Sequence, residues 1–166
     1  MSGNGVQVSV DVDLSEFNYL IKNINETVYA EVGVLGRKTS KKKDDKSVSV
    51  VDYAIAHEFG VVEHNLPRRS FIKDPLEAHL KEGINEVKGS IGKMLERGRV
   101  DKAVDIMGMK AVEIIKKAFE TENDGKWAPL SPVTVAAMKP SRKKGYKILQ
   151  DTTDLLTSIS SKVVKE

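Results

Sequence analysis

Two long amphipathic segments, separated by only a few residues, constrain the fold of this 166-residue chain more than any other feature. The first begins at Asp74-Pro75, because proline suits the first helical turn, and it ends near Gly98. The second covers about residues 100–121, and the short link between them predicts an antiparallel helical hairpin. Each segment carries one apolar stripe at helical spacing. The stripes are Leu76, Leu80, Ile84, Val87, Ile91 and Leu95, and Val104, Met107, Ala111, Ile114, Ile115 and Ala118.

Alternating apolar and polar residues predict strands elsewhere in the chain. Residues 6–13 and 28–35 both alternate with period two and are rich in β-branched residues, which is typical of half-buried strands. Residues 14–25 lie between them and have helical spacing after a capping-box pattern. Residues 158–164 alternate weakly and are expected to form a final strand.

A further helix is expected before Gly60. Ser47 or Ser49 would be its N-cap, and Gly60 its C-cap. The expected buried face consists of Val51, Ala54, Ile55 and Phe59.

These patterns predict a single α+β domain over residues 1–166, with a small antiparallel or mixed sheet packed against two long helices plus shorter helices. Residues 61–73 are expected to form an ordered loop. Ser131-Pro132 would open a short helix ending near Met138. A helical turn within 149–156 would be capped by Asp151 or Thr152.

Composition excludes several classes of protein. The chain has no cysteine, which rules out disulfides and thiolate metal sites. No apolar run approaches the roughly 18–20 residues of a membrane span, and no secretory signal pattern is visible, so we expect the product to stay in the cytosol or to leave it inside a larger object. The net charge of +3 is mild for a dedicated nucleic-acid binder.

No catalytic motif is complete. His57-Glu58 would fit a zinc-binding helix only with a second histidine at position 61, which is valine. Phosphate-binding loops and nucleophile elbows are absent from the sequence as well. We therefore expect no enzyme activity, no cofactor and no metal.

Two exposed basic loops are predicted, at about 37–47 and 139–147. Their charge would suit nonspecific contact with DNA phosphates or with an acidic partner, although solvated loops are the simpler interpretation. Aromatic residues that would stack on bases do not alternate with these charges. The basic residues concerned are Lys41, Lys42, Lys43, Arg142, Lys143 and Lys144.

Two stretches of the sequence resemble a known family. Residues 52–60 (DYAIAHEFG), followed by 66–72 (LPRRSFI), resemble the HEFG and proline-arginine pattern of phage virion-morphogenesis and neck proteins. Residues 127–134 (WAPLSPVT), followed by 148–159 (ILQDTTDLLTSI), resemble the ending of the virion-morphogenesis (tail-completion) family of Mu-like and related tailed phages. Ser70 and Thr153 depart from the pattern, which usually has proline and glycine there.

The resemblance implies a structural virion protein, assembled in the host cytoplasm, that forms a ring of six or twelve copies where the DNA-filled head joins the tail. Its neighbours would be head-completion or connector proteins and tail-terminator or tail-tube proteins, with genomic DNA in the channel. A tail-terminator ring and a cytosolic nucleic-acid-binding module are the alternatives. Arg68 and Arg69 would pair with a neighbour or extend along the surface, and Trp127 would contact a partner or anchor the core. The candidate interface residues are His57, Glu58, Arg68, Arg69, Phe71, Trp127 and Asp151.

Overall fold

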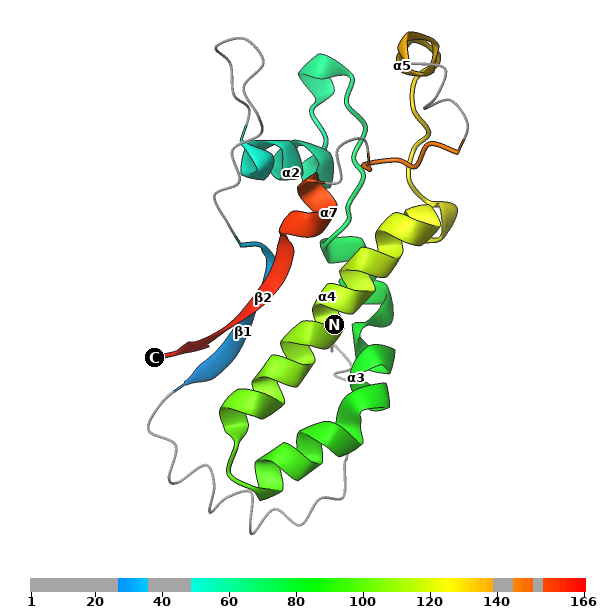
Figure 1. Cartoon of the computed structure of the whole chain (residues 1–166). Coiled ribbons are helices and arrows are strands. Elements are labelled where there is room, and N and C mark those ends of the chain that lie inside the picture. Colours follow the sequence, from blue (N-terminus) through cyan, green and yellow to red (C-terminus); the bar gives the residue numbers. More distant parts are fainter. Residues whose placement is uncertain (1–26, 36–48, 139–144, 151–153) are drawn as a thin grey trace, which may run out of the picture.

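The structure, a computed structural model, describes residues 27–35, 49–138, 145–150 and 154–166. Two strands and a set of helices of unequal length make up this part of the chain (Figure 1). They are β1 (Val28–Val34), α2 (Val50–Phe59), the 3-10 helix η1 (Val62–His64), α3 (Lys73–Glu96), α4 (Val100–Gly125), α5 (Pro132–Ala137), α7 (Asp154–Ser158) and β2 (Ile159–Lys165). The α+β prediction is confirmed. The elements expected at 6–13 and 14–25, and most of both basic loops, lie outside the described residues.

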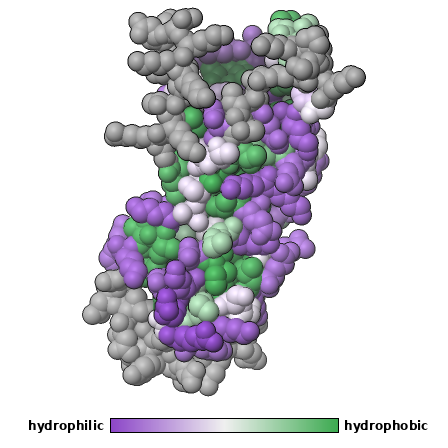
Figure 2. All heavy atoms as spheres, viewed as in Figure 1, coloured by the Kyte–Doolittle hydropathy of each residue, from purple (hydrophilic) through white to green (hydrophobic). Residues whose placement is uncertain are grey.

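The helical hairpin of α3 and α4 is the largest unit of the fold, and it agrees with the prediction. Both helices lie side by side and antiparallel in the lower and middle parts of the molecule (Figure 1). The right-handed part of α4 ends at Thr121, because Glu122, Asn123 and Asp124 all have left-handed backbone angles. In Figure 2 the outer side of α4, on the right, is mainly hydrophilic, as expected for the solvent-facing side of an amphipathic helix.

The sheet has two antiparallel strands, and one of its faces covers α4. The register runs from Val28 opposite Lys165 to Val34 opposite Ile159. Gly108 of α4 lies beneath the sheet, where a Cβ would meet the Cβ atoms of Ser161 at 3.0 Å and Ala30 at 3.1 Å. A glycine therefore permits the close approach of this helix to the strands.

Aromatic side chains hold the upper end of the hairpin to the rest of the fold. Phe119 of α4 lies between Phe71 and Trp127, with ring centroids 5.4 and 5.5 Å apart and edge-to-face geometry in both pairs. Such pairs contribute beyond the area that they bury. Ile115, Leu155 and Ile159 complete this core and join α4 to α7 and β2.

The predicted apolar face of α2 is wrong for three of its four residues, and only Ala54 is buried as expected. Ser49 caps the helix as expected, with its Oγ accepting from the N–H of Val51 at 3.2 Å. However, Ile55 and Phe59 face outward, with 53% and 70% of their surface exposed, and Val51 is exposed as well. The buried residues are Val50, Ala54, His57 and Glu58, so two polar side chains take the place of apolar ones. The physical reason is the role of Glu58, described below.

Smaller differences concern the segment after α2. Residues 61–73 include η1, and α3 begins at Lys73, so that Pro75 is the third helical residue rather than the first. The short helix after Ser131 is confirmed, with Ser131 Oγ accepting from the N–H of Thr134 at 3.1 Å. The final strand is confirmed as β2.

Substitution of Gly108 by valine tests the contact between α4 and the sheet. We expect G108V to lower the free energy of unfolding by about 1–3 kcal/mol, because the added methyl groups overlap the strands. Gly89→Val is the matched control, since nothing lies within 4 Å of its Cβ position in α3, and it should change stability by less than about 0.5 kcal/mol. Urea unfolding of both variants measures the difference. Equal effects would show that α4 and the sheet are not in close contact.

Candidate functional site

Glu58 is a buried carboxylate that caps the N-terminus of α3. Its Oε2 accepts from the N–H groups of Phe71 at 2.8 Å and Ile72 at 3.0 Å, and its Oε1 accepts from the N–H of Lys73 at 3.0 Å. The hydroxyl of Ser70 also donates to Oε1, at 2.7 Å. Because the first N–H groups of a helix have no partner within it, a negative charge here satisfies them and complements the helix dipole. Ile72 at the N-cap position has no side-chain acceptor of its own.

Arg69 joins the same loop to the segment after α4. Its side chain is buried, and it donates from Nε to the carbonyl of Ala128 at 2.8 Å and from Nη2 to the carbonyl of Pro129 at 3.0 Å. Its backbone N–H donates to the carbonyl of His57 at 2.8 Å. Among the described residues no carboxylate lies within 4 Å of the guanidinium, and burial lowers the pKa of Arg69. The guanidinium thus acts as a donor to backbone carbonyls.

Trp127 makes the second connection between the two segments. Its Nε1 donates to the carbonyl of Ser70 at 2.9 Å, and its ring packs against Phe119. The indole is buried, so it is an anchor of the core. We call these connected residues, Glu58, Arg69, Ser70 and Trp127, the clamp.

His57 lies beside the clamp as a buried imidazole. Its ring contacts the edge of Tyr53, with centroids 4.3 Å apart, and its Nδ1 has no hydrogen-bond partner in the described part of the chain. The pKa of His57 is lowered to about 4, mainly because burial disfavours the charged ring and secondarily because of the positive charge of Arg69. The side chain is therefore neutral at pH 7.

Arg68 lies at the surface and pairs within its own chain. Its guanidinium contacts the carboxylate of Asp74 at 2.9 and 2.5 Å, a bidentate arrangement that holds the pKa of Asp74 below its usual range. The pair connects the loop to the first turn of α3.

Five of the predicted interface residues are buried inside the subunit: His57, Glu58, Arg69, Phe71 and Trp127. They are brought together in and around the clamp. The sequence did not predict this arrangement, although the number of residues between Glu58 and Ser70 can be read from it directly. Asp151 and the basic residues at 41–43 and 142–144 lie outside the described residues.

A polar cavity of about 180 Å³ lies between α3 and α4. Lys110 spans it, paired with Glu86 at 2.6 Å and Glu113 at 2.9 Å. His79 and Asp124 form a further pair at 3.1 Å. No group of three or more potential metal ligands occurs in the described segments. No helix in those segments is long and apolar enough to cross a membrane.

No family model, curated protein or solved structure matches this chain.

Removal of the Glu58 carboxylate tests the clamp. We expect E58A to lower the free energy of unfolding by about 2–4 kcal/mol, because three backbone donors and Ser70 lose their acceptor. E58Q keeps one oxygen and should lose less. Urea unfolding can be followed by fluorescence of Trp127, the only tryptophan and itself part of the clamp. Glu63→Ala, at an exposed position of η1, is the control, and an E58A loss no larger than that of E63A would contradict the role of Glu58.

Protonation of His57 makes the fold sensitive to mild acid. Above pH 6.5 the ring is neutral in the folded and unfolded states alike. As the pH falls from 6.5 to about 4, the unfolded chain takes up a proton that the folded chain does not, so the free energy of unfolding decreases. We expect this group to remove about 2 kcal/mol between pH 7 and pH 5.

The measurement is urea unfolding at both pH values for the wild-type chain and H57Q. The variant should lose less stability than the wild type over this interval. His64→Gln, at an exposed position of η1, is the control for an unrelated histidine. Parallel behaviour of wild type and H57Q would show that His57 is not buried as described.

Proposed function

We propose that this chain is a non-enzymatic structural subunit of a tailed-phage particle, which forms a ring at the head–tail junction as a neck or tail-completion protein. The proposal begins from the resemblance carried by residues 52–72 and 127–159. Its mechanism is binding and closure of a ring, with no chemical step.

One structural observation supports it best: the two resembling stretches are a single physical unit. Arg69 from the first stretch donates to two carbonyls of the second, and Trp127 from the second donates to a carbonyl of the first. These contacts join residues 57 to 60 positions apart in the chain. Arg69 and Trp127, which belong to the resembling stretches, therefore hold these two stretches together, as expected of residues in a protein whose role is structural.

The exposed apolar side chains of α2 give additional support. Ile55 and Phe59 lie in solvent although the helix buries two polar residues. Large apolar groups that gather on a surface mark sites of protein–protein contact. A subunit that works by assembly needs such a surface.

A stop codon in the gene tests the proposal in particles of the phage that encodes this chain. We expect host cells infected with the mutant to accumulate DNA-filled heads and separate tails, seen by electron microscopy, because the junction is missing. Expression of the wild-type chain in trans should restore joined particles. Mass spectrometry of purified wild-type particles should find the chain in them.

Other outcomes would favour the alternatives. Joined, infectious particles without the chain would contradict the proposal. Tails of irregular length would favour a tail terminator. Tight, salt-sensitive binding of duplex DNA by a monomer, with the chain absent from particles, would favour a nucleic-acid-binding module.

A further inference from the structure

Helix α2 buries two polar side chains, His57 and Glu58, beside Val50 and Ala54, and it exposes three apolar side chains. Val51, Ile55 and Phe59 are four residues apart and form one row, and Val62 of η1 follows them with 93% of its surface exposed. We call these four residues, three on α2 and one on η1, the α2 face. Scattered apolar residues are normal on a surface, but apolar residues that gather on one side of a helix mark a contact site.

The end of the α2 face is held in an ordered turn. The N–H of Val61 donates to the carbonyl of Leu66 at 2.9 Å, and the N–H of Leu66 donates to the carbonyl of Val61 at 3.0 Å. Asn65, which lies between them, has a left-handed backbone conformation. Val62 is therefore presented by a fixed turn. Binding through a preorganised group loses little conformational entropy.

Charges beside the α2 face indicate what binds there. Asp52 and Glu63 flank it, both are exposed, and neither has a cation within 4 Å among the described residues. A suitable occupant combines apolar side chains with positive charge, since opposite charges across an interface favour association.

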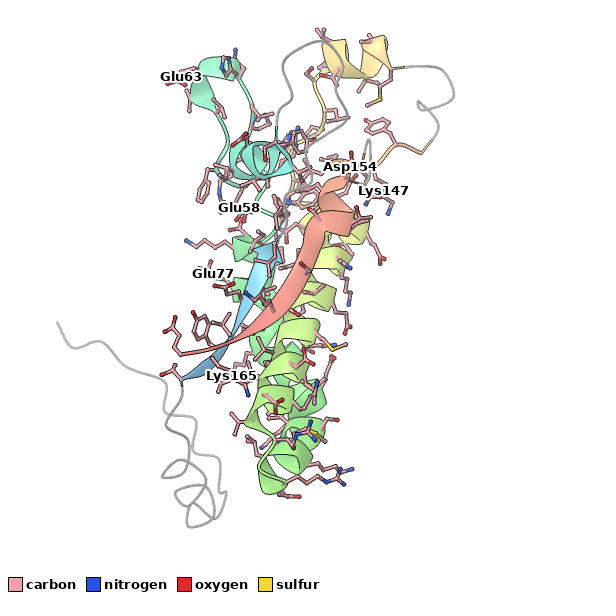
Figure 3. All side chains as sticks on the ribbon, turned by 60° about the vertical axis from the view of Figure 1, so that its left-hand side comes forward. Glu58, Glu63, Glu77, Lys147, Asp154 and Lys165 are labelled. Carbon is pink, nitrogen blue, oxygen red and sulfur yellow. The ribbon has the colours of Figure 1, made fainter. Side chains whose placement is uncertain are left out.

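The same chain offers such a surface on its other side. Val133 of α5 and Tyr146 are exposed apolar residues, with 78% and 38% of their surface accessible. Lys147 follows Tyr146, and its ammonium group donates to the carbonyl of Glu120 at 2.6 Å. No carboxylate of the described segments lies within 4 Å of it, so its charge is not paired with an opposite charge there. We call these three residues the α5 flank. Figures 1 and 3 both place α2 on one side of the upper half and α5 on the other, and Figure 3 shows Lys147 on the side away from α2 and Glu63.

We infer that the occupant of the α2 face is a second copy of this chain, which contributes its α5 flank. Asp52 and Glu63 of one copy would face the Lys147 side of the next, and Ile55, Phe59 and Val62 would pack against Val133 and Tyr146. Because two different surfaces meet, a pair of copies keeps one free α2 face and one free α5 flank, and repetition generates a ring or a filament. This inference rests on the proposed function and names the contact through which the subunits would join.

Cross-linking tests the pairing of surfaces, and the chain has no native cysteine to interfere. D52C and K147C are made in separate chains, mixed and treated with a short bismaleimide. A covalent dimer is expected in the mixture, little in either variant alone, and a ladder of larger species from the double variant. Ser90→Cys, exposed on α3, replaces K147C in the control mixture, which should give no dimer. A dimer from D52C alone would show that two α2 faces meet, and would overturn the inference.

Complementation of two defective variants gives an independent test. F59D and V133D should each weaken self-association about tenfold or more, as measured by sedimentation velocity of the full chain, because each places a charge in an apolar contact. Their mixture should recover a heterodimer, since each variant retains one intact surface. Met109→Asp, exposed on α4 outside both surfaces, should associate like the wild type. Failure of the mixture to associate, or a wild-type chain that stays monomeric at every concentration, would overturn the inference.

The two proposals fail in different ways. Junction particles that assemble normally with F59D would remove the role of the α2 face and leave the proposed function intact. A chain that is absent from particles, yet cross-links between positions 52 and 147, would remove the proposed function and keep the contact.

Discussion

The hydrogen bonds of the Glu58 carboxylate are the interaction on which the rest of the structure depends. A buried carboxylate costs several kcal/mol unless its charge is compensated. Here three backbone N–H groups at the start of α3 and the hydroxyl of Ser70 supply that compensation. The requirement is mutual, because the N-cap residue Ile72 has no polar side chain and α3 would otherwise begin with unpaired donors. The end of α2 and the beginning of α3 are thus fixed to each other.

This connection extends to the C-terminal half through Arg69 and Trp127. The backbone N–H of Arg69 donates to the carbonyl of His57, and its guanidinium donates to the carbonyls of Ala128 and Pro129. Trp127 packs on Phe119, near the end of the long hairpin. The segment that leads to α5 therefore has a defined position relative to α2. In the proposed ring, the angle between the two contact surfaces of a subunit would decide whether the ring closes, so this fixed relation would have a direct consequence for assembly.

Periodicity predicted the long elements because their burial follows their apolar pattern. The stripes of α3 and α4, the end of right-handed helix at Thr121 and the final strand were all visible in the sequence. The same rule failed for α2, since it assumes that polar residues face water. A cap supplied by Glu58 to a helix that begins fifteen residues later has no local signature. Three of the four clamp residues, Glu58, Arg69 and Trp127, could be listed from the resemblance, but their burial depended on contacts between distant segments.

The buried charge of α2 and its exposed apolar row have a common geometric origin. Successive residues of a helix are about 100° apart, so a helix that turns Ala54, His57 and Glu58 inward must turn Ile55 and Phe59 away. A sequence that needed only a stable monomer would place polar residues on that outer row, since they would leave the cap of α3 unchanged. The apolar row thus has no explanation within the described part of the subunit, whereas burial against another copy would explain it. The cap decides which way α2 faces, and the identity of the outward residues decides what α2 can bind.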